Sequence, residues 1–243
     1  MAYIEGRNPV IEAIKSGREI DKIMVANSAK EGSIKKLLGM AKEKNLVIQY
    51  VERQKLDEIS ESHAHQGVIA QVSEYSYWDL DELIAETKKK DEDPFFIILD
   101  EINDPHNLGA IIRTADAVGA HGVIIPKRRS VNVTPVAIKA SAGAIEYVPV
   151  CKVTNIVNTI KRLKEEGLWI AAVDMDGDAF YKQNMKGPLG LVIGSEGYGI
   201  SRLVKENCDF NVSMPMVGHV TSLNASVAGS IILYEVLKQR IGK

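Results

Sequence analysis

Short, almost wholly apolar runs alternate with amphipathic segments beyond residue 94. Four such runs cover residues 95–99, 122–125, 168–173 and 189–193. Runs of this kind are typical of parallel strands that are buried on both faces. Apolar residues recur at helical spacing in three further segments, residues 107–118, 154–166 and 197–206. The pattern predicts an α/β domain with a parallel sheet.

The beginning of the chain shows the same alternation in shorter elements. Helical spacing over residues 8–16 and 32–44 alternates with β-branched runs at residues 22–25 and 46–51. These elements are too few for a large sheet. We therefore expect a small, separate α/β domain.

Residues 77–93 interrupt the alternation. They are crowded with Lys, Asp and Glu and contain few large apolar residues. Charged stretches of this kind are usually solvated. We predict a charged linker here, between a domain at residues 1–76 and a second domain at residues 94–243.

The composition limits the class of protein. With 45% apolar and 26% charged residues, the 243-residue chain is expected to be globular. No apolar run approaches the roughly 20 residues of a membrane-spanning helix, and residues 1–10 lack the apolar stretch of a secretory signal. Cys151 and Cys208 form no zinc-binding spacing. We expect a cytoplasmic protein without membrane segments or a metal.

The net charge of −2 argues against a protein that wraps nucleic acid, because phosphate binding usually shows as a basic surplus. Any RNA site must therefore be a local patch. The most concentrated candidate is Lys127, Arg128 and Arg129, for which an ordinary solvated loop is the alternative interpretation.

Parallel sheets bind ligands at the carboxyl ends of their strands, so we look for chemistry in three polar loops, around the segments just after Leu99, Ile193 and Met214. The first, residues 100–116, leads into a helix and contains Asn107 and Arg113. From the residues alone, Asn107 is either a helix N-cap or a site residue. Arg113 is either a surface partner of Asp116 or a site residue.

The second loop, residues 194–201, contains three glycines at which a backbone can approach a ligand closely. Their spacing is not G-x-G-x-x-G, so a dinucleotide site is poorly supported. Glu196 is expected in the first turn of the following helix, where the helix dipole favours a carboxylate.

The third loop, residues 212–226, leads into a final helix. Ser222 is a candidate cap of that helix, Asn224 a candidate first-turn residue, and His219 a loop residue without a catalytic task. The apolar residues of the helix are expected to be mostly buried: Val227, Ala228, Ile231, Leu233, Tyr234 and Leu237.

Together the three loops resemble the three motifs of the SpoU/TrmH family of RNA ribose 2′-O-methyltransferases. The matching segments are NLGAIIRTAD at residues 107–116, GSEG at residues 194–197, and MPM at residues 214–216 with SLNASVA at residues 222–228. More loosely, EGRNPV at residues 5–10 and HQGV at residues 65–68 resemble the family's substrate-binding domain. The arrangement is most similar to the RlmB-like 23S rRNA methyltransferases.

The resemblance implies S-adenosylmethionine as the cofactor. The family holds it, bent, mainly through backbone groups at the positions of Gly194, Met214 and Leu223, with Gly197 in the same loop. It also implies that no metal takes part.

The resemblance further implies catalytic roles. The arginine at the position of Arg113 is assigned to activating the ribose hydroxyl, and the asparagine at the position of Asn107 supports it. The site is held in addition by Glu196, Ser222 and Asn224. Because a guanidinium normally stays protonated, Arg113 either has an unusual environment or stabilises the developing alkoxide electrostatically.

At the level of the whole molecule, the resemblance implies a homodimer and a catalytic domain tied in a trefoil knot. It implies a first domain of the ribosomal L30e type, with Arg7 and Asn8 contributing to RNA specificity. The expected product is 2′-O-methylguanosine in 23S rRNA, with transfer RNA as the alternative substrate.

Two other classes of protein remain as alternatives. A non-catalytic RNA-binding protein could keep this architecture, but it would have no reason to keep all the catalytic motif residues. A nicotinamide-dependent oxidoreductase is suggested only by the parallel sheet, and fold analogy is a poor guide to function.

Overall fold

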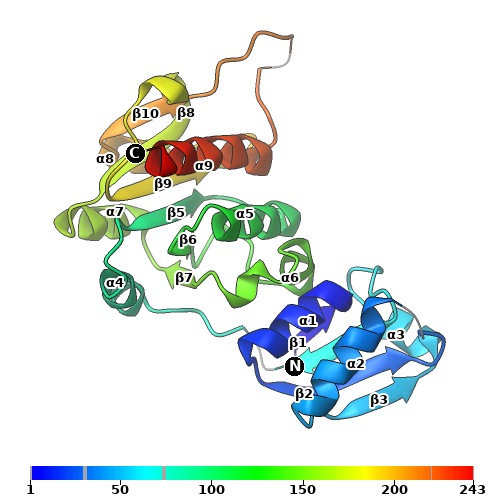
Figure 1. The fold of residues 1–243 in the computed structure, drawn as a ribbon. Coiled ribbons are helices and arrows are strands. Elements are labelled where there is room, and N and C mark those ends of the chain that lie inside the picture. The colour runs from blue at the N-terminus through cyan, green and yellow to red at the C-terminus, as the bar shows by residue number, and fades with distance from the viewer. Residues whose placement is uncertain (1, 30–31, 73–74, 220, 243) are drawn as a thin grey trace.

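A computed structural model describes residues 2–29, 32–72, 75–219 and 221–242, and Val220 of the third loop lies outside these described residues. The chain forms two sheets, each with its own helices (Figure 1). The blue and cyan first part lies at one end of the molecule, and the larger second part carries the three motif loops.

The first sheet has four strands in the order β1-β4-β2-β3. Its elements are β1 (Ala2–Glu5), α1 (Arg7–Ser16), β2 (Ile20–Ala26), α2 (Ser33–Glu43), β3 (Ile48–Val51), α3 (Arg53–Ile59) and β4 (Val68–Val72). The two helices and two strands that the pattern predicted are present. The strands β1 and β4 and the seven-residue helix α3 were not predicted, because they are too short to show a clear period.

The second sheet has six parallel strands in the order β10-β8-β9-β5-β6-β7. The strands are β5 (Phe95–Asp100), β6 (Gly122–Pro126), β7 (Val150–Val153), β8 (Trp169–Ala179), β9 (Leu189–Gly194) and β10 (Phe210–Ser213). The four apolar runs are β5, β6, β8 and β9, which confirms the predicted parallel sheet. The edge strands β7 and β10 have only four residues each, several of them partly exposed, and therefore form no apolar run.

Helices cover both faces of this sheet. They are α4 (Leu80–Lys88), α5 (Pro105–Ala117), α6 (Pro135–Ala140), α7 (Ile156–Glu165), α8 (Arg202–Asn207) and α9 (Ala225–Ile241), with 3-10 turns η1 (Ala144–Glu146) and η2 (Phe180–Lys182). On β5, Phe95, Ile97 and Leu99 join the core under α5 and α9. Phe96 and Ile98 join the core under α4, α7 and α8. Both faces of the strand are buried, which explains its unbroken apolar run.

The predicted linker over residues 77–93 is wrong in one respect, because it contains helix α4. Leu83 and Ile84 of this helix are buried against the sheet. A Cβ on Gly122 of β6 would lie only 2.9 Å from Leu83 Cδ2, so the helix packs closely. The charged residues of α4 are on its exposed side and conceal the short apolar stripe.

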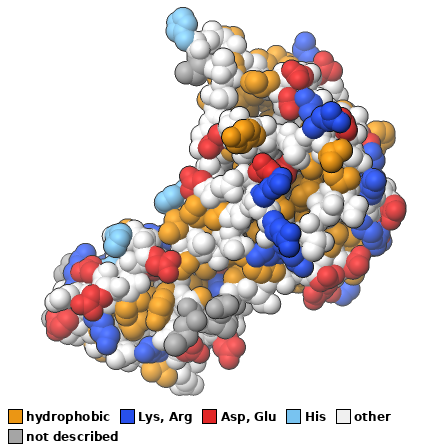
Figure 2. Space-filling model, turned by 180° about the vertical axis from the view of Figure 1, so that it is seen from behind, with side chains coloured by type: hydrophobic (Ala, Val, Ile, Leu, Met, Phe, Trp, Pro, Cys, Tyr) orange, Lys and Arg blue, Asp and Glu red, His pale blue; other side chains and the backbone are white. Residues whose placement is uncertain are grey.

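The surface shows no single extended basic face from behind. Lys and Arg side chains are interspersed with Asp and Glu, and hydrophobic side chains lie between them (Figure 2). This agrees with the net charge of −2 and restricts a phosphate-binding site to a local group of residues.

The two parts of the chain pack on each other along α1. Glu12 accepts a hydrogen bond of 2.7 Å from the Tyr147 hydroxyl, and Arg18 Nη1 lies 2.7 Å from Glu146 Oε1. Gly143 has φ +100°, and a Cβ there would lie 2.5 Å from Glu12 Cβ, so this close approach requires glycine. Buried apolar residues from both parts form one continuous core cluster.

A second polar contact joins β1 to α6. Glu5 is fully buried and accepts hydrogen bonds from Ser60 Oγ at 2.6 Å and from Ser62 Oγ. Lys139 Nζ donates to Ser62 Oγ at 3.0 Å and to the Ala64 carbonyl. Burial acts to raise the pKa of the Glu5 carboxyl, but the hydrogen bonds from Ser60 and Ser62 outweigh it and hold the pKa below its ordinary value.

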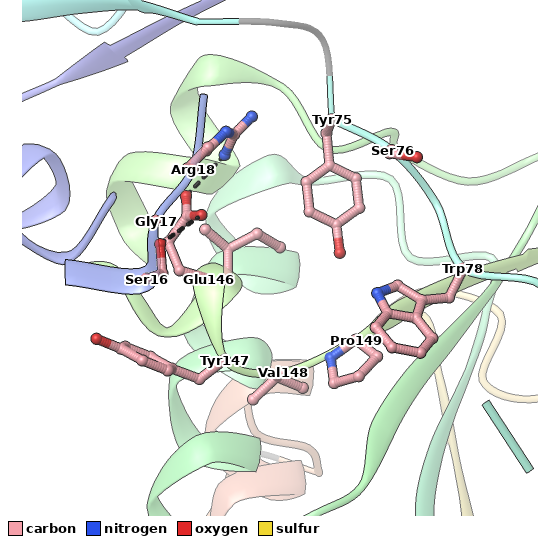
Figure 3. A pocket seen from close by; sticks show the side chains of 11 residues that line it. Ser16, Gly17, Arg18, Tyr75, Ser76, Trp78, Glu146, Tyr147, Val148 and Pro149 are labelled. Carbon is pink, nitrogen blue, oxygen red and sulfur yellow. Dashed lines mark hydrogen bonds and ion pairs between the residues drawn. The ribbon is translucent and has the colours of Figure 1, made fainter. Parts of the chain in front are cut away.

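A cavity of about 300 Å³ lies at the junction of the two parts, beside the paired Arg18 and Glu146 (Figure 3). Tyr75 and Trp78 line it, as does Pro149, which directly precedes β7. The cavity is therefore at the amino-terminal end of the parallel strands. Ligand sites of such sheets lie at the opposite, carboxyl end.

Candidate active site

The first two motif loops start side by side at the carboxyl edge of the second sheet. β5 and β9 are neighbours, with Asp100 opposite Gly194. From this pair the strand order runs one way to β6 and β7 and the other way to β8 and β10. Such a reversal leaves a crevice at the strand ends, where ligands bind.

Glu196 connects the three motif loops. Its Oε1 accepts hydrogen bonds from Asn107 Nδ2 at 2.8 Å and from Asn224 Nδ2 at 2.5 Å. It also accepts one of 3.3 Å from the backbone N–H of Ala225, the first residue of α9. A carboxylate is favoured at a helix N-terminus by the helix dipole. We call Asn107, Glu196 and Asn224 the Glu196 cluster.

Glu196 does not lie in a helix, contrary to the prediction. The helix α8 begins only at Arg202. Before it, Ser195 and Gly199 exchange backbone hydrogen bonds of 3.1 and 2.9 Å and close a tight turn. Gly199 has φ +65°, a left-handed conformation that breaks the helical spacing seen in the sequence.

The start of α5 also differs from one interpretation of the sequence. Asp104, not Asn107, is the N-cap, and its side chain accepts a hydrogen bond of 2.8 Å from the backbone N–H of His106. Asn107 lies inside the helix and is buried, and its side-chain amide donates to Glu196. The cap interpretation of Asn107 is therefore wrong.

Arg113 is exposed on α5 and does not pair with Asp116. Among the described residues it has no hydrogen bond or ion pair. A cavity of about 430 Å³ lies beside Glu196, and Arg113 is not among its lining residues. The surface-pair interpretation is therefore wrong. The single chain leaves this guanidinium available to a ligand.

Asn224, not Ser222, caps α9. Its Oδ1 accepts hydrogen bonds from the backbone N–H groups of Ser226 and Val227, at 3.0 and 3.3 Å. One side chain thus fixes the helix start and, through Nδ2, the position of Glu196. Ser222 is exposed and lies in the cavity wall.

A cavity of about 430 Å³ opens beside the Glu196 cluster. Six of the residues predicted for the site line it: Gly194, Glu196, Gly197, Met214, Ser222 and Leu223. Ile193, Ala225 and Ala228 add an apolar or small lining. The volume is within the range of small-molecule sites.

Gly194 and Gly197 both line the cavity, but the space around a Cβ differs at the two positions. A Cβ on Gly194 would lie 2.2 Å from the carbonyl carbon of Gly199, so the loop itself excludes a side chain there. Nothing lies within 4 Å of a Cβ built on Gly197. The space beside Gly197 is therefore open to a ligand.

Two family models match this chain. Residues 94–234 match the SpoU rRNA Methylase family, and residues 3–78 match the RNA 2′-O ribose methyltransferase substrate binding model. The chain belongs to the SpoU methylase family. Its three motif loops are thus those of an RNA methyltransferase.

Relatives of this SpoU methylase support the assignment over its whole length. A Bacillus subtilis protein named as a TrmH family tRNA/rRNA methyltransferase is 51% identical, with 98% of this chain and 96% of that protein covered. The SpoU methyltransferase AviRb from Streptomyces viridochromogenes, crystallised with AdoMet, superposes with a TM-score of 0.82 at 26% identity, covering 99% and 91% of the two chains. An A. aeolicus TrmH/SpoU tRNA modifying enzyme superposes with a TM-score of 0.57 at 30% identity, covering 66% and 85%.

In the substrate-binding part of the SpoU methylase, the motif residues hold the fold together. Arg7 Nε donates to the Gln66 carbonyl at 3.1 Å, which ties the start of α1 to the turn before β4. His65 is buried, with Nε2 2.8 Å from Asp57 Oδ1. Asn8 is exposed beside them. RNA binding by Arg7 and Asn8 stays a prediction.

The predicted basic run Lys127, Arg128 and Arg129 is exposed in the loop after β6. It lies at the same carboxyl edge as the motif loops. Contact of these residues with RNA also stays a prediction.

Asp100 is a site residue that the sequence analysis missed. It is buried at the end of β5, and its Oδ2 accepts a hydrogen bond of 2.7 Å from the backbone N–H of Ser201. This fixes the far end of the second motif loop. A carboxylate that directly follows an unbroken apolar strand was the available signal.

Neither cysteine of the SpoU methylase lines the cavity beside Glu196. Burial raises the pKa of the Cys151 and Cys208 thiols to about 12, which suppresses the reactive thiolate. Within the described residues, no His, Cys, Asp and Glu side chains are grouped as a metal would require. Among the same residues, no helix has the length and apolar character to cross a membrane.

Proposed function

We propose that this SpoU methylase transfers the methyl group of S-adenosylmethionine to a ribose 2′-hydroxyl of RNA. The Glu196 cluster carries the proposal, because it joins one side chain from each motif loop beside a cavity of suitable size. A protein that only bound RNA would not need this arrangement.

The cavity fits S-adenosylmethionine. Ile193 and Leu223 offer apolar contact for an adenine ring, and the open space at Gly197 allows close approach to the backbone. Among the described lining residues there are two carboxylates, Glu196 and Asp174, the second of which pairs with Lys205 outside the lining at 3.0 Å, and no Lys or Arg. This charge distribution suits a cationic cofactor. AviRb, which has the same fold, was crystallised with AdoMet.

Bound S-adenosylmethionine supplies a methyl group on a positively charged sulfur. The protein must then orient the hydroxyl and help it lose a proton. Arg113 is assigned to this task. Because a guanidinium is a very weak base, its role is electrostatic stabilisation of the developing alkoxide, together with binding of a neighbouring phosphate. Glu196 holds Asn107 in a fixed position near the start of the same helix.

The proposed substrate is a guanosine of 23S rRNA. The match to the SpoU rRNA Methylase model and the separate substrate-binding part support a large RNA. Transfer RNA is the second candidate, because the names of the B. subtilis and A. aeolicus relatives include tRNA.

The proposed active form is a homodimer that covers one face of α9. The prediction that the apolar residues of this helix are mostly buried is wrong for Val227, Ile231 and Tyr234, which are 47%, 41% and 53% exposed. Their spacing puts them on one side of the helix. An unpartnered apolar stripe of this kind supports a protein interface.

Three further properties are proposed from family membership. They are the trefoil knot, the L30e-type fold of the first part, and a cytoplasmic location. The division into units 1–76 and 94–243 is proposed with them, with α4 assigned to the second unit because it packs on that sheet.

Mass spectrometry of nucleosides tests the function. The purified protein is incubated with S-adenosylmethionine that carries a deuterated methyl group and with unmodified 23S rRNA or tRNA transcripts. Labelled 2′-O-methylguanosine is expected from 23S rRNA, and label in tRNA alone would select the second candidate. Glu196→Ala should lose activity with RNA binding retained. The enzyme assignment would be contradicted if neither RNA were labelled and calorimetry showed no S-adenosylmethionine binding. Binding of NAD would favour the oxidoreductase alternative.

A further inference from the structure

A second cavity, of about 440 Å³, opens at the same edge of the sheet. It lies among the loops that follow β5 and β6 and the first residues of α7 and α8. Its apolar lining residues are Pro126, Ile156, Val157 and Leu203. Leu203 is 62% exposed, although it is a large apolar residue. We call this space the arginine cleft, because three arginines also line it.

The three arginines that line the cleft are Arg128, Arg129 and Arg202. Within the described part of the chain, Arg128 has no hydrogen bond or ion pair. Arg129 and Arg202 lie 3.5 and 3.1 Å from carboxylates, but both side chains are more than four-fifths exposed. Exposed pairs of this kind are weak and exchange readily for a stronger anionic partner.

Two acidic residues also line the cleft, and each carboxylate already has a partner in the protein. Asp100 already accepts the backbone N–H of Ser201. Glu101 faces Arg129 at 3.5 Å, beyond ideal ion-pair geometry. The lining therefore keeps a positive surplus in a chain whose net charge is −2.

The backbone of the cleft is held in an unusual conformation. Glu101 and Arg129 have φ +58° and +57°, which side chains other than glycine rarely adopt. The loop after β6, which contains Arg128 and Arg129, is tied to the first motif loop, because Val131 N–H and Ser130 Oγ donate to the Ile102 carbonyl at 2.9 and 3.2 Å. Such conformations gather at ligand clamps, where the surrounding contacts maintain them.

The arginine cleft and the cofactor cavity lie at opposite ends of one loop. Gly194 and Glu196 line the cofactor cavity, whereas Ser201 and Arg202 line the arginine cleft. The hydrogen bond from Ser201 to Asp100 fixes the end of the loop that lines the cleft. A chain that enters the active site can therefore continue along this edge into the cleft.

We propose that the arginine cleft binds an unpaired nucleotide of the RNA substrate, close to the nucleotide that is methylated. The apolar lining residues contact the base, and the guanidinium groups bind its phosphate, with planar donors that match phosphate oxygens. The combination of apolar and arginine lining residues favours RNA over an acidic peptide, which offers charge without flat bases. The inference rests on the proposed function.

Binding of a fluorescent single-stranded 12-nucleotide RNA of mixed sequence tests the cleft in the full-length protein. Arg128→Ala combined with Arg202→Ala should weaken binding about 10-fold or more. The slope of log affinity against log salt concentration should become shallower by roughly 1.4, because two phosphate contacts are lost. Leu203→Ala should weaken binding with the salt slope unchanged, because it removes only base contact. S-adenosylmethionine affinity should stay within twofold of the wild type in all variants.

The matched control is Lys182→Ala with Lys186→Ala. Both lysines are exposed and neither lines the arginine cleft, so the control removes the same charge elsewhere. Equal losses in the control and the arginine variant would overturn the proposal, as would unchanged RNA affinity after both the arginine and Leu203 substitutions. Equal competition by a polyglutamate peptide of the same charge would overturn it in favour of an acidic partner. If the binding pattern holds but the wild type methylates no RNA, the proposed function fails and the cleft stands.

Discussion

At the scale of single residues, the site depends on side chains that do more than one task. Asn224 caps α9 with its oxygen and binds Glu196 with its nitrogen. Glu196 in turn accepts a hydrogen bond from Asn107, which lies 89 residues earlier in the chain. Arg113 contrasts with these residues, because it is exposed and has no partner among the described residues.

Arg113→Ala should leave folding and cofactor binding nearly intact and slow single-turnover methylation by about 10²-fold or more, as for a lost proton-transfer or charge-stabilising group. Arg113→Lys should not restore the rate, since an ammonium lacks the planar fork of donors. Rapid-quench assays with saturating RNA and cofactor measure this. Asp116→Ala, one helical turn away, is the control. A normal rate for Arg113→Ala would remove Arg113 from the reaction.

At the scale of elements, the second motif loop is shaped by its own backbone. Gly194 is needed because the chain returns over it at Gly199, whereas Gly197 faces open space. The same loop was expected to begin a helix, and the turn between Ser195 and Gly199 replaces that helix. The two glycines can therefore be separated by experiment.

Gly197→Val should keep the melting temperature within a few degrees of the wild type and lower S-adenosylmethionine affinity at least tenfold, because the side chain enters the cavity. Gly194→Val should lower both stability and affinity, since its Cβ would collide with the Gly199 backbone; overpacking of this kind costs about 1–3 kcal/mol or more. Calorimetric titration and thermal unfolding separate the two effects. Unchanged cofactor affinity in folded Gly197→Val would place the cofactor elsewhere.

At the scale of the whole molecule, the two parts share one core cluster and a polar junction. The contact between Lys139 and the Glu5 hydrogen-bond group joins the substrate-binding part to α6. α6 packs closely on α5, since a Cβ on Gly109 would lie 2.5 Å from the Ala137 carbonyl oxygen. The helix that carries Asn107 and Arg113 is thus supported from the RNA-binding side.

Removing the Glu5 charge should weaken this junction in a pH-dependent way. Because the folded-state pKa of Glu5 lies below its ordinary value of 4.5, its contribution to stability is full above that pH and is lost as pH falls through the folded pKa. Glu5→Gln should therefore lower the free energy of unfolding by about 1–3 kcal/mol at pH 7 and flatten the decline in acid. Urea unfolding at pH 7 and at pH 3 measures both. Glu43→Gln, at an exposed position, should behave like the wild type; an equal effect there would contradict the assignment.

Deletion of residues 2–76 should retain S-adenosylmethionine binding and abolish RNA methylation. All the cavity-lining residues lie between 173 and 228, so the cofactor site stays complete. The melting temperature should fall, because Ile138 and Ile145, buried in the shared core, lose part of their cover. Calorimetry and methylation assays on the shortened chain check this. A folded, dimeric product without cofactor affinity would contradict the proposed division of tasks.

Local patterns in the sequence were enough to predict the parallel strands β5, β6, β8 and β9 and the three motif loops. These features depend on local apolar runs and on short motifs, which are visible without knowledge of chain packing. The short edge strands and the helix α4 were not predicted, because their apolar residues are few and mixed with charged residues.

The way in which the loops combine was visible only in the tertiary structure. It brought Asn107 and Asn224 to one carboxylate oxygen, gave the caps to Asp104 and Asn224, and left one face of α9 exposed. It also brought Arg202 and Arg128 to the lining of one cavity, although 74 residues separate them in the sequence. These arrangements depend on which strand ends lie side by side in the sheet. Strand order joins residues far apart in the chain, and no local period records it.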